Sequence, residues 1–175
     1  MNDLTKQPRQ LPGCCASLSS QLIDQIITRL PRAPSLVFSI GCGTGLLEAH
    51  LLRQSCSALR IYGVEVPSCH VKYLPAHRVL RVPSTAALHT DAAFAEVILF
   101  VYPRNTHLIA EYCSAYSVNG ALEQAMVIVH SSERHHAEHA LSTAFTNVEL
   151  VTDSGLPEYE VFLVASCPKV QSGRP

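Results

Sequence analysis

The chain has 175 residues, enough for one domain with a sizeable hydrophobic core. Its net charge of −1 excludes a strong bulk attraction to nucleic acid or to an anionic membrane surface. Every apolar run falls well short of the ~20 residues that a membrane-spanning helix needs, so we expect no membrane partner.

The seven cysteines form no Cys-x-x-Cys pair and show no even spacing. An odd count without such a framework favours reduced thiols and a cytoplasmic location. Residues 1–13 are polar and lack the apolar centre of a secretory signal peptide. We therefore expect a single cytoplasmic domain over residues 1–175, and no pattern indicates its oligomeric state.

Two segments precede the predicted core. Residues 1–16 contain Pro8, Pro12 and Gly13 and are predicted to form a loose arm. Residues 17–30 place apolar side chains at helical spacing along one face. We expect this helix to end at the prolines that follow it and to pack across a sheet edge or over a bound ligand.

A strand, a glycine-rich turn and a helix come next. Residues 36–40 form an apolar run that is typical of a buried parallel strand. Gly41, Gly43 and Gly45 let the backbone turn sharply and approach a ligand closely, since glycine has no Cβ. The helix predicted over residues 46–54 begins with unpaired N–H groups that can receive a polar group. Open α/β sheets hold nucleotide-like cofactors in this way.

Two more strands are predicted downstream, and each leads into polar residues. Residues 60–64 form the second strand, which is followed by the carboxylate of Glu65. Residues 78–82 form the third strand, with Ser84 and Thr85 just beyond it. These polar residues are expected at the same edge of the sheet as the glycines.

The fourth predicted strand covers residues 95–101 and is followed by Tyr102, Arg104 and Asn105. A helix with an apolar face comes after it, and residues 126–130 then form a fifth strand. The apolar face of that helix consists of Leu108, Ile109, Tyr112, Cys113 and Tyr116.

The end of the chain is predicted to form a capped helix, a pair of strands and a tail. Ser131 or Ser132 is expected to cap the helix that follows the fifth strand. Residues 147–152 and 158–165 predict two strands joined by a turn, and residues 169–175 are expected to form a tail. The sheet should therefore close with an antiparallel hairpin.

The sequence Ile40-Gly41-Cys42-Gly43-Thr44-Gly45 closely resembles the first motif of class I S-adenosylmethionine-dependent methyltransferases. Residues 61–66 resemble the next motif, in which an acid, here Glu65, accepts hydrogen bonds from both ribose hydroxyls. A carboxylate suits this role because it accepts from two donors at once. The resemblance covers residues 36–165 and implies a Rossmann-like α/β fold. Such a fold has a mostly parallel sheet of about seven strands, closed by an antiparallel hairpin.

The same resemblance implies S-adenosylmethionine as the cofactor. Its expected contacts are Ser39, Gly41, Cys42, Gly43, Gly45, Glu65, Val66, Ser84, Thr85 and Phe100. The chain departs from the family pattern in two ways. Ser39 stands where the family usually has an acid, and no acid follows the third strand to hold the adenine.

Tyr102, Arg104 and His130 are the candidates for chemistry. The family places substrate-facing residues after the fourth strand, and His130 ends the fifth. Tyr102 could hydrogen-bond a substrate, and Arg104 could bind a carboxylate. Equally, Tyr102 could fill the pocket wall, Arg104 could lie on a helix surface and His130 could bond a loop.

His135, His136 and His139 are close enough in sequence to hold a metal ion. However, Ala137 and Ala140 mark the buried face of their helix, so the histidines are expected on the solvated side. We therefore predict no metal.

Two functions remain open. The first is methyl transfer from S-adenosylmethionine to a small-molecule acceptor. The second is a non-catalytic S-adenosylmethionine-binding protein that acts as a sensor or through a partner. A nicotinamide cofactor is disfavoured, because Leu46 stands where dinucleotide-binding chains have Gly or Ala. The sequence does not indicate the acceptor.

Overall fold

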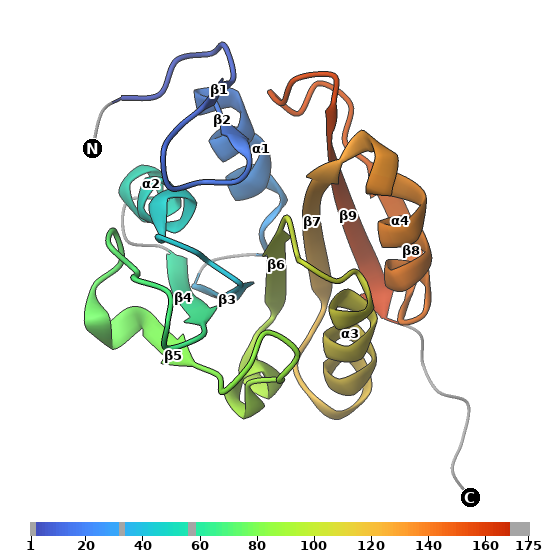
Figure 1. The fold of residues 1–175 in the computed structure, drawn as a ribbon. Helices are drawn as coiled ribbons and strands as arrows, with labels where there is room; N and C mark the ends of the chain where they lie inside the picture. The colour runs from blue at the N-terminus through green and yellow to red at the C-terminus, as the bar shows by residue number, and fades with distance from the viewer. Residues whose placement is uncertain (1–2, 32–33, 56–58, 169–175) are drawn as a thin grey trace, which may run out of the picture.

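Residues 3–31, 34–55 and 59–168 are described by a computed structural model. A central sheet with helices on both faces dominates the molecule (Figure 1). Its strands follow the spatial order β5-β4-β3-β6-β7-β9-β8. In chain order they are β3 (Ser35–Ile40), β4 (Leu59–Glu65), β5 (Val79–Arg81), β6 (Val97–Val101), β7 (Gln124–His130), β8 (Phe145–Leu150) and β9 (Glu160–Pro168). The predicted tail, residues 169–175, lies outside the described residues.

One strand of the seven runs against the others. β3 pairs in parallel with β4 on one side and β6 on the other, and β5 and β7 extend this arrangement. β9 inserts between β7 and β8 and is antiparallel to both. The predicted fold, a mostly parallel seven-stranded sheet closed by an antiparallel hairpin, is confirmed.

The helices form a layer on each face of the sheet. α1 (Ser20–Arg29) and α2 (Leu46–Gln54) cover one face, and α3 (His107–Asn119) and α4 (Arg134–Ser142) cover the other (Figure 1). Three short 3-10 turns connect elements: η1 (Ala76–Arg78), η2 (Thr90–Phe94) and η3 (Ser131–Glu133). Within the described part of the chain, no helix is long and apolar enough to cross a membrane.

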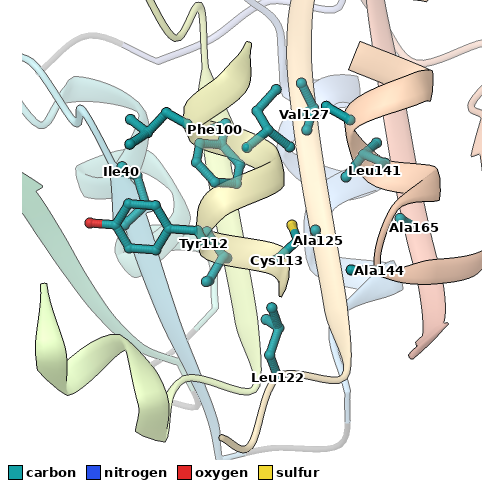
Figure 2. Packing of buried hydrophobic residues seen from close by; sticks show 14 of the residues in the cluster. Ile40, Phe100, Tyr112, Cys113, Leu122, Ala125, Val127, Leu141, Ala144 and Ala165 are labelled. Carbon is teal, nitrogen blue, oxygen red and sulfur yellow. The ribbon is translucent and has the colours of Figure 1, made fainter. Parts of the chain in front are cut away.

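Each face of the sheet has its own hydrophobic core. Leu99 and Phe100 are neighbours on β6 and are both fully buried, but they belong to different cores because strand side chains alternate. Phe100 meets the ring of Tyr112 edge-on at a centroid distance of 5.9 Å. Figure 2 shows this contact within the core under α3 and α4. Leu99 packs with Leu22 of α1 on the opposite face.

The helix predicted over residues 46–54 coincides with α2. Its start depends on Gly45, which takes a left-handed φ of 79° at the N-cap. The predicted strands lie within one to three residues of those observed, and β5 and β6 are each two residues shorter than predicted.

Three local predictions need correction. The arm predicted to be loose contains β1 (Arg9–Gln10), which pairs with β2 (Ser17–Leu18). The helix predicted from residue 17 starts at residue 20, and its buried side chains lie on a sheet face rather than at a sheet edge. Neither predicted serine caps α4, because both lie in η3 and α4 begins after it.

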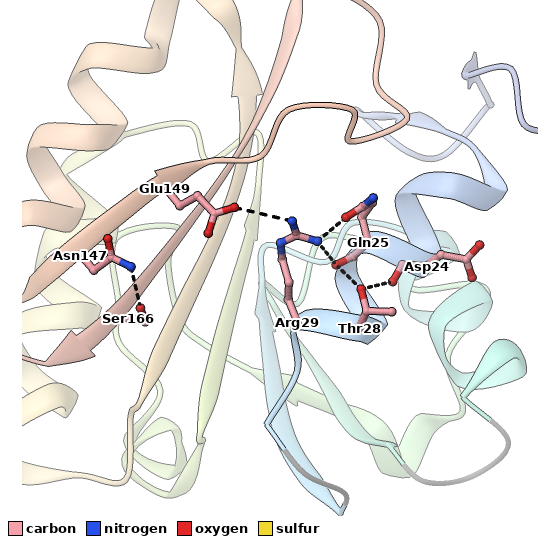
Figure 3. A network of polar contacts seen from close by, with 7 residues as sticks. All are labelled: Asp24, Gln25, Thr28, Arg29, Asn147, Glu149 and Ser166. Atoms are coloured by element: carbon pink, nitrogen blue, oxygen red, sulfur yellow. Dashed lines mark hydrogen bonds and ion pairs between the residues drawn. The ribbon is translucent and has the colours of Figure 1, made fainter.

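Polar contacts between α1 and β8 add little to the packing of this helix. The Arg29 guanidinium lies 3.6 Å from the Glu149 carboxylate and also bonds to the side chain of Gln25 (Figure 3). Exposed ion pairs of this kind contribute about 0–1 kcal/mol. The buried apolar face of α1 therefore holds the helix in place.

Ser19→Ala should destabilise the protein by about 1–3 kcal/mol. The buried Ser19 hydroxyl accepts from the Leu22 N–H at 3.0 Å and donates to the Gly155 carbonyl at 2.7 Å. The control is Thr28→Ala, which removes an exposed hydroxyl from the same helix and should change stability by no more than about 0.5 kcal/mol. Urea denaturation measures both, and equal effects would contradict the capping role.

Candidate functional site

The strand order reverses beside β3. The chain passes from β3 to β4 and β5 on one side, whereas β6 and β7 lie on the other. Ligands of open α/β sheets bind at such a reversal, beyond the carboxyl ends of the strands. A cavity of about 480 Å³ lies here, which is within the range of small-molecule sites. Of the predicted site residues, it is lined by Gly41, Gly43, Glu65, Val66, Thr85, Tyr102 and Arg104.

The three glycines of the turn serve different purposes. Gly41 and Gly43 have φ angles of 71° and 56°, and a Cβ at either position would meet no atom within 4 Å. A ligand can therefore reach the backbone at both. A Cβ at Gly45 would lie 2.9 Å from the Leu74 side chain. Gly45 does not line the cavity and instead lets the start of α2 pack closely against a loop.

Glu65 is oriented by the protein itself. Its Oε2 accepts from the Gly43 N–H at 2.9 Å, and its Oε1 accepts from the Val66 N–H at 2.8 Å. The carboxylate therefore ties the turn after β3 to the end of β4. Each oxygen has a further lone pair, so the group can still accept from two hydroxyls.

The segment after β5 contributes Thr85 and Ala87 to the cavity, but not Ser84, which is exposed. Tyr112 of α3 supports this segment from the core, and sequence reasoning did not identify it as a site residue. Its hydroxyl accepts from the His89 N–H at 3.0 Å and donates to the Ala87 carbonyl at 3.4 Å. Burial raises the pKa of Tyr112 to about 12, so the phenol stays neutral.

Tyr102 follows β6 with a strained φ of 50°. Its hydroxyl donates to Oε1 of the buried Glu160 at 2.9 Å. Glu160 also accepts from the Ser17 N–H at 3.1 and 3.2 Å. Burial raises the pKa of Tyr102, and the bond to Glu160 raises it further. The Tyr102 hydroxyl thus has a partner within the protein.

A second cavity of about 300 Å³ adjoins the first, because Tyr102, Pro103 and Arg104 line both. His130 lines only this second cavity. Its Nδ1 accepts from the Ser132 N–H at 3.2 Å, and its ring stacks on Tyr159. The three candidates for chemistry are therefore gathered at one edge, with His130 set apart from the larger cavity.

Besides Gly45 and Ser84, three more predicted cofactor contacts do not line the larger cavity. Phe100 is fully buried because its position on β6 turns its side chain into the core. Cys42 packs beneath the turn against Gly63 of β4. Ser39 is buried and donates a hydrogen bond to Glu48.

Glu48, which sequence reasoning missed, is only 1% exposed in the first turn of α2. Its Oε1 accepts from the Ser39 hydroxyl at 2.5 Å, whereas Oε2 has no hydrogen-bond partner among the described residues. Burial raises the pKa of Glu48 to about 7. The sequence does hold one sign that Glu48 is buried. Its neighbours in the predicted helix, Leu46, Leu47 and Leu51, are apolar.

Two cysteines also border the larger cavity without having been predicted there. Cys15 comes from the N-terminal segment, and Cys69 from the loop after β4. The Cys69 thiol donates to the Gly43 carbonyl at 3.5 Å, and burial raises the pKa of Cys69, which favours the thiol form. No spacing pattern marks these two residues in the sequence.

His135, His136 and His139 are exposed on α4, as predicted. His135 lies 3.3 Å from Glu138, and His136 lies 3.6 Å from Glu133. Among the residues that the structure describes, no group of three His, Cys, Asp or Glu side chains is arranged to hold a metal ion.

No family model and no curated protein matches the sequence. Solved structures do match. Precorrin-6y C5,15-methyltransferase from Geobacter metallireducens GS-15 has a TM-score of 0.60 and 10% identity, covering 95% of this chain and 100% of that one. A SAM-dependent methyltransferase from Aquifex aeolicus has a TM-score of 0.60 and 13% identity, covering 83% and 90%. The chain has a class I methyltransferase-like fold.

This methyltransferase-like fold is not tied to one named reaction. Precorrin 8w decarboxylase from Methanobacterium thermoautotrophicum is also similar, with a TM-score of 0.61 and 14% identity over 95% of this chain and 100% of that one. The likeness to all three proteins is one of fold. The activity of this chain therefore depends on the residues of its own site.

Glu48→Gln should remove a pH dependence of stability. The folded-state pKa of about 7 exceeds the ordinary value of 4.5, so protonated Glu48 favours the folded state. This contribution is fully present below pH 4.5 and is lost as the pH rises through 7. The difference between these two pKa values corresponds to about 3 kcal/mol.

Urea denaturation at pH 4.5 and pH 8 checks this expectation. From pH 4.5 to pH 8, the free energy of unfolding of Glu48→Gln should rise by about 3 kcal/mol relative to that of wild type. The control Glu123→Gln changes an exposed carboxylate and should show no such gain. A constant difference between Glu48→Gln and wild type at both pH values would contradict the pKa assigned to Glu48.

Proposed function

We propose that the protein binds S-adenosylmethionine in the 480 Å³ cavity and transfers its methyl group to a small-molecule acceptor. The observation that carries this proposal is the paired geometry of Gly43 and Glu65. An open glycine backbone and a pre-oriented carboxylate border one cavity at the strand-order reversal. The similarity to methyltransferases of known structure supports the same conclusion.

The residues present fit this cofactor. The space above Gly41 and Gly43 admits a ligand against the backbone, which a Cβ would obstruct. Glu65 keeps lone pairs for two ribose hydroxyls. Thr85 and Ala87, supported by Tyr112, offer a wall of small side chains for the adenine. When bound, the cofactor supplies a methyl group on a sulfonium centre.

Two of the protein's own residues have separate tasks in this proposal. Glu65 orients the ribose, and its charge-assisted hydrogen bonds strengthen that contact. Tyr102, held by Glu160, forms a fixed wall between the two cavities. Displacement at a methyl group requires alignment of the acceptor and exclusion of water, so a rigid wall suits the reaction.

The position of Arg104 supports one kind of acceptor. It is exposed at the junction of the two cavities, and no ion pair of the described residues involves it. A guanidinium here favours a small acceptor that carries a carboxylate. The 300 Å³ cavity, which His130 also lines, is the proposed acceptor compartment.

A non-catalytic cofactor-binding protein is the second candidate. It is favoured by the state of Tyr102, whose hydroxyl bonds to Glu160 instead of remaining free for an acceptor. In both cases we propose a cytoplasmic protein, because the six cysteines within the described residues are free thiols. Neither candidate includes a nucleic acid, a membrane or a metal.

Glu65→Gln should weaken the binding of S-adenosylhomocysteine by ten-fold or more, because one charged hydrogen bond is worth about 1.5–3 kcal/mol. The control Glu158→Gln neutralises an exposed carboxylate and should bind as wild type does. Titration calorimetry measures both affinities. Wild-type binding of NAD without binding of S-adenosylhomocysteine would overturn the cofactor assignment.

Arg104→Gln should raise the KM for a carboxylate acceptor about ten-fold or more and leave S-adenosylhomocysteine affinity unchanged. Release of S-adenosylhomocysteine, screened with phenols, carboxylates, thiols and amines, first identifies the acceptor. Arg60→Gln removes an exposed cation on β4 and serves as the control. Tight cofactor binding with no turnover for any acceptor class would favour the non-catalytic candidate.

A further inference from the structure

Glu48 is a buried acid without a cationic partner. No ion pair of the described residues includes it, and its Oε2 has no hydrogen-bond partner among them. A buried carboxylate is unfavourable unless it is paired or neutralised. An ionised Glu48 therefore requires one cationic or hydrogen-bond-donating group that the described residues do not supply.

The space next to Glu48 has the size of such a group. A cavity of about 40 Å³ is bordered by Glu48, Gly41 and Gly43, and the N-terminal segment closes it through Cys14 and Cys15. A water-sized group needs roughly 10–15 Å³ of such space, so an ammonium fits and a ring does not. The 40 Å³ cavity is thus a compartment for one small polar group.

This compartment adjoins the proposed cofactor site. Four residues line both it and the 480 Å³ cavity: Cys15, Gly41, Gly43 and Val101. A ligand that lies along the glycine turn can therefore extend one substituent towards Glu48. The amino acid part of S-adenosylmethionine carries one primary ammonium group of suitable size and charge.

We propose that Glu48, reaching from helix α2, is the binding partner of the ligand's α-ammonium group, and that this group enters as Glu48 releases its proton. The inference rests on the proposed cofactor. It also explains how the chain can have a serine, Ser39, at the position where the family pattern has an acid. Ser39 donates to Oε1 of Glu48, so Oε2 remains as the oxygen that can accept from the ligand.

Several titratable groups face Glu48. They are Cys14 from the N-terminal segment, Cys42 from the glycine turn and Glu65 from β4. Burial raises the pKa of both thiols well above neutrality, so neither ionises near pH 7. Burial raises the pKa of Glu48 itself to about 7, and the charge of Glu65 acts in the same direction.

The proton balance follows from these values. Below pH 7 the reaction is Glu48–COOH + R–NH₃⁺ → Glu48–COO⁻···⁺H₃N–R + H⁺, with one proton released to solvent. The association constant should therefore rise with pH, by close to ten-fold per pH unit well below 7. It should level off near neutrality and fall where the ligand's own ammonium loses its proton, at about pH 8.

Titration calorimetry between pH 5.5 and 7 tests the proposal with two ligands. S-adenosylhomocysteine carries the ammonium, whereas 5′-methylthioadenosine lacks the whole amino acid part. For wild type, S-adenosylhomocysteine affinity should rise about ten-fold or more over this range, with proton release detected from buffers of different ionisation enthalpy. The affinity for 5′-methylthioadenosine should not change.

Two variants separate ligand recognition from a structural role. Glu48→Gln should abolish the pH dependence and weaken S-adenosylhomocysteine at least ten-fold at pH 7.5, without affecting 5′-methylthioadenosine. The double variant Ser39→Asp/Glu48→Gln exchanges acid and neutral partner across the same hydrogen bond. It should recover most of the lost affinity, which a merely structural role for Glu48 would not produce.

The outcomes distinguish this inference from the proposed function. Binding of both ligands with the same pH dependence in wild type and Glu48→Gln would overturn the role of Glu48 alone. An equal loss of affinity for both ligands in Glu48→Gln would also overturn it, since the defect would then be structural. Binding of neither ligand by wild type would overturn the proposed function and the inference together.

Discussion

The position of β3 in the interior of the sheet constrains the rest of the structure. It pairs with β4 on one side and β6 on the other, so its residues are enclosed by strands and by both helix layers. The chain must leave β3 abruptly to enter α2, which packs back on one face. Only a turn with positive φ angles at Gly41, Gly43 and Gly45 permits this path. The same turn exposes backbone at the point where the strand order reverses.

Two carboxylates lie on either side of this turn in contrasting environments. Glu65 accepts from two backbone N–H groups and borders the larger cavity. Glu48 is buried, accepts from one hydroxyl and has a pKa raised by burial to about 7. Two chemically similar side chains thus differ in their properties because their surroundings differ, as in many active sites. One is suited to accept hydrogen bonds from hydroxyls, and the other to receive a cation.

The N-terminal segment completes the site from a distance in sequence. The Thr44 hydroxyl donates to the Gly13 carbonyl at 2.6 Å, and Ser17 donates its N–H to Glu160. Glu160 in turn receives the Tyr102 hydroxyl, so the segment, β9 and the end of β6 share one polar cluster. The arm expected to be loose, residues 1–16, therefore encloses the compartment beside Glu48, and Ser17, which follows it, helps to restrain the wall between the two cavities.

By itself, the sequence determined the fold class and the position of the glycine turn. Apolar strands such as residues 36–40 and the terminal hairpin have local patterns, and the positive φ angles need glycine whatever surrounds them. Glu65 was equally visible because it ends a strand beside that turn. The cavity lining was predicted less well: Phe100 and Ser84 do not line it, while Cys15 and Tyr112 do.

Only the tertiary structure decided which side chains meet. Ser39 and Glu48 belong to different elements, and Glu160 is more than a hundred residues from Ser17. Such pairs leave no periodicity in the sequence, because each depends on how separate elements pack. The pKa of Glu48 has the same origin. An acid in the first turn of a helix is ordinary in the sequence. Its burial in the folded protein, and to a smaller extent the nearby charge of Glu65, raise its pKa.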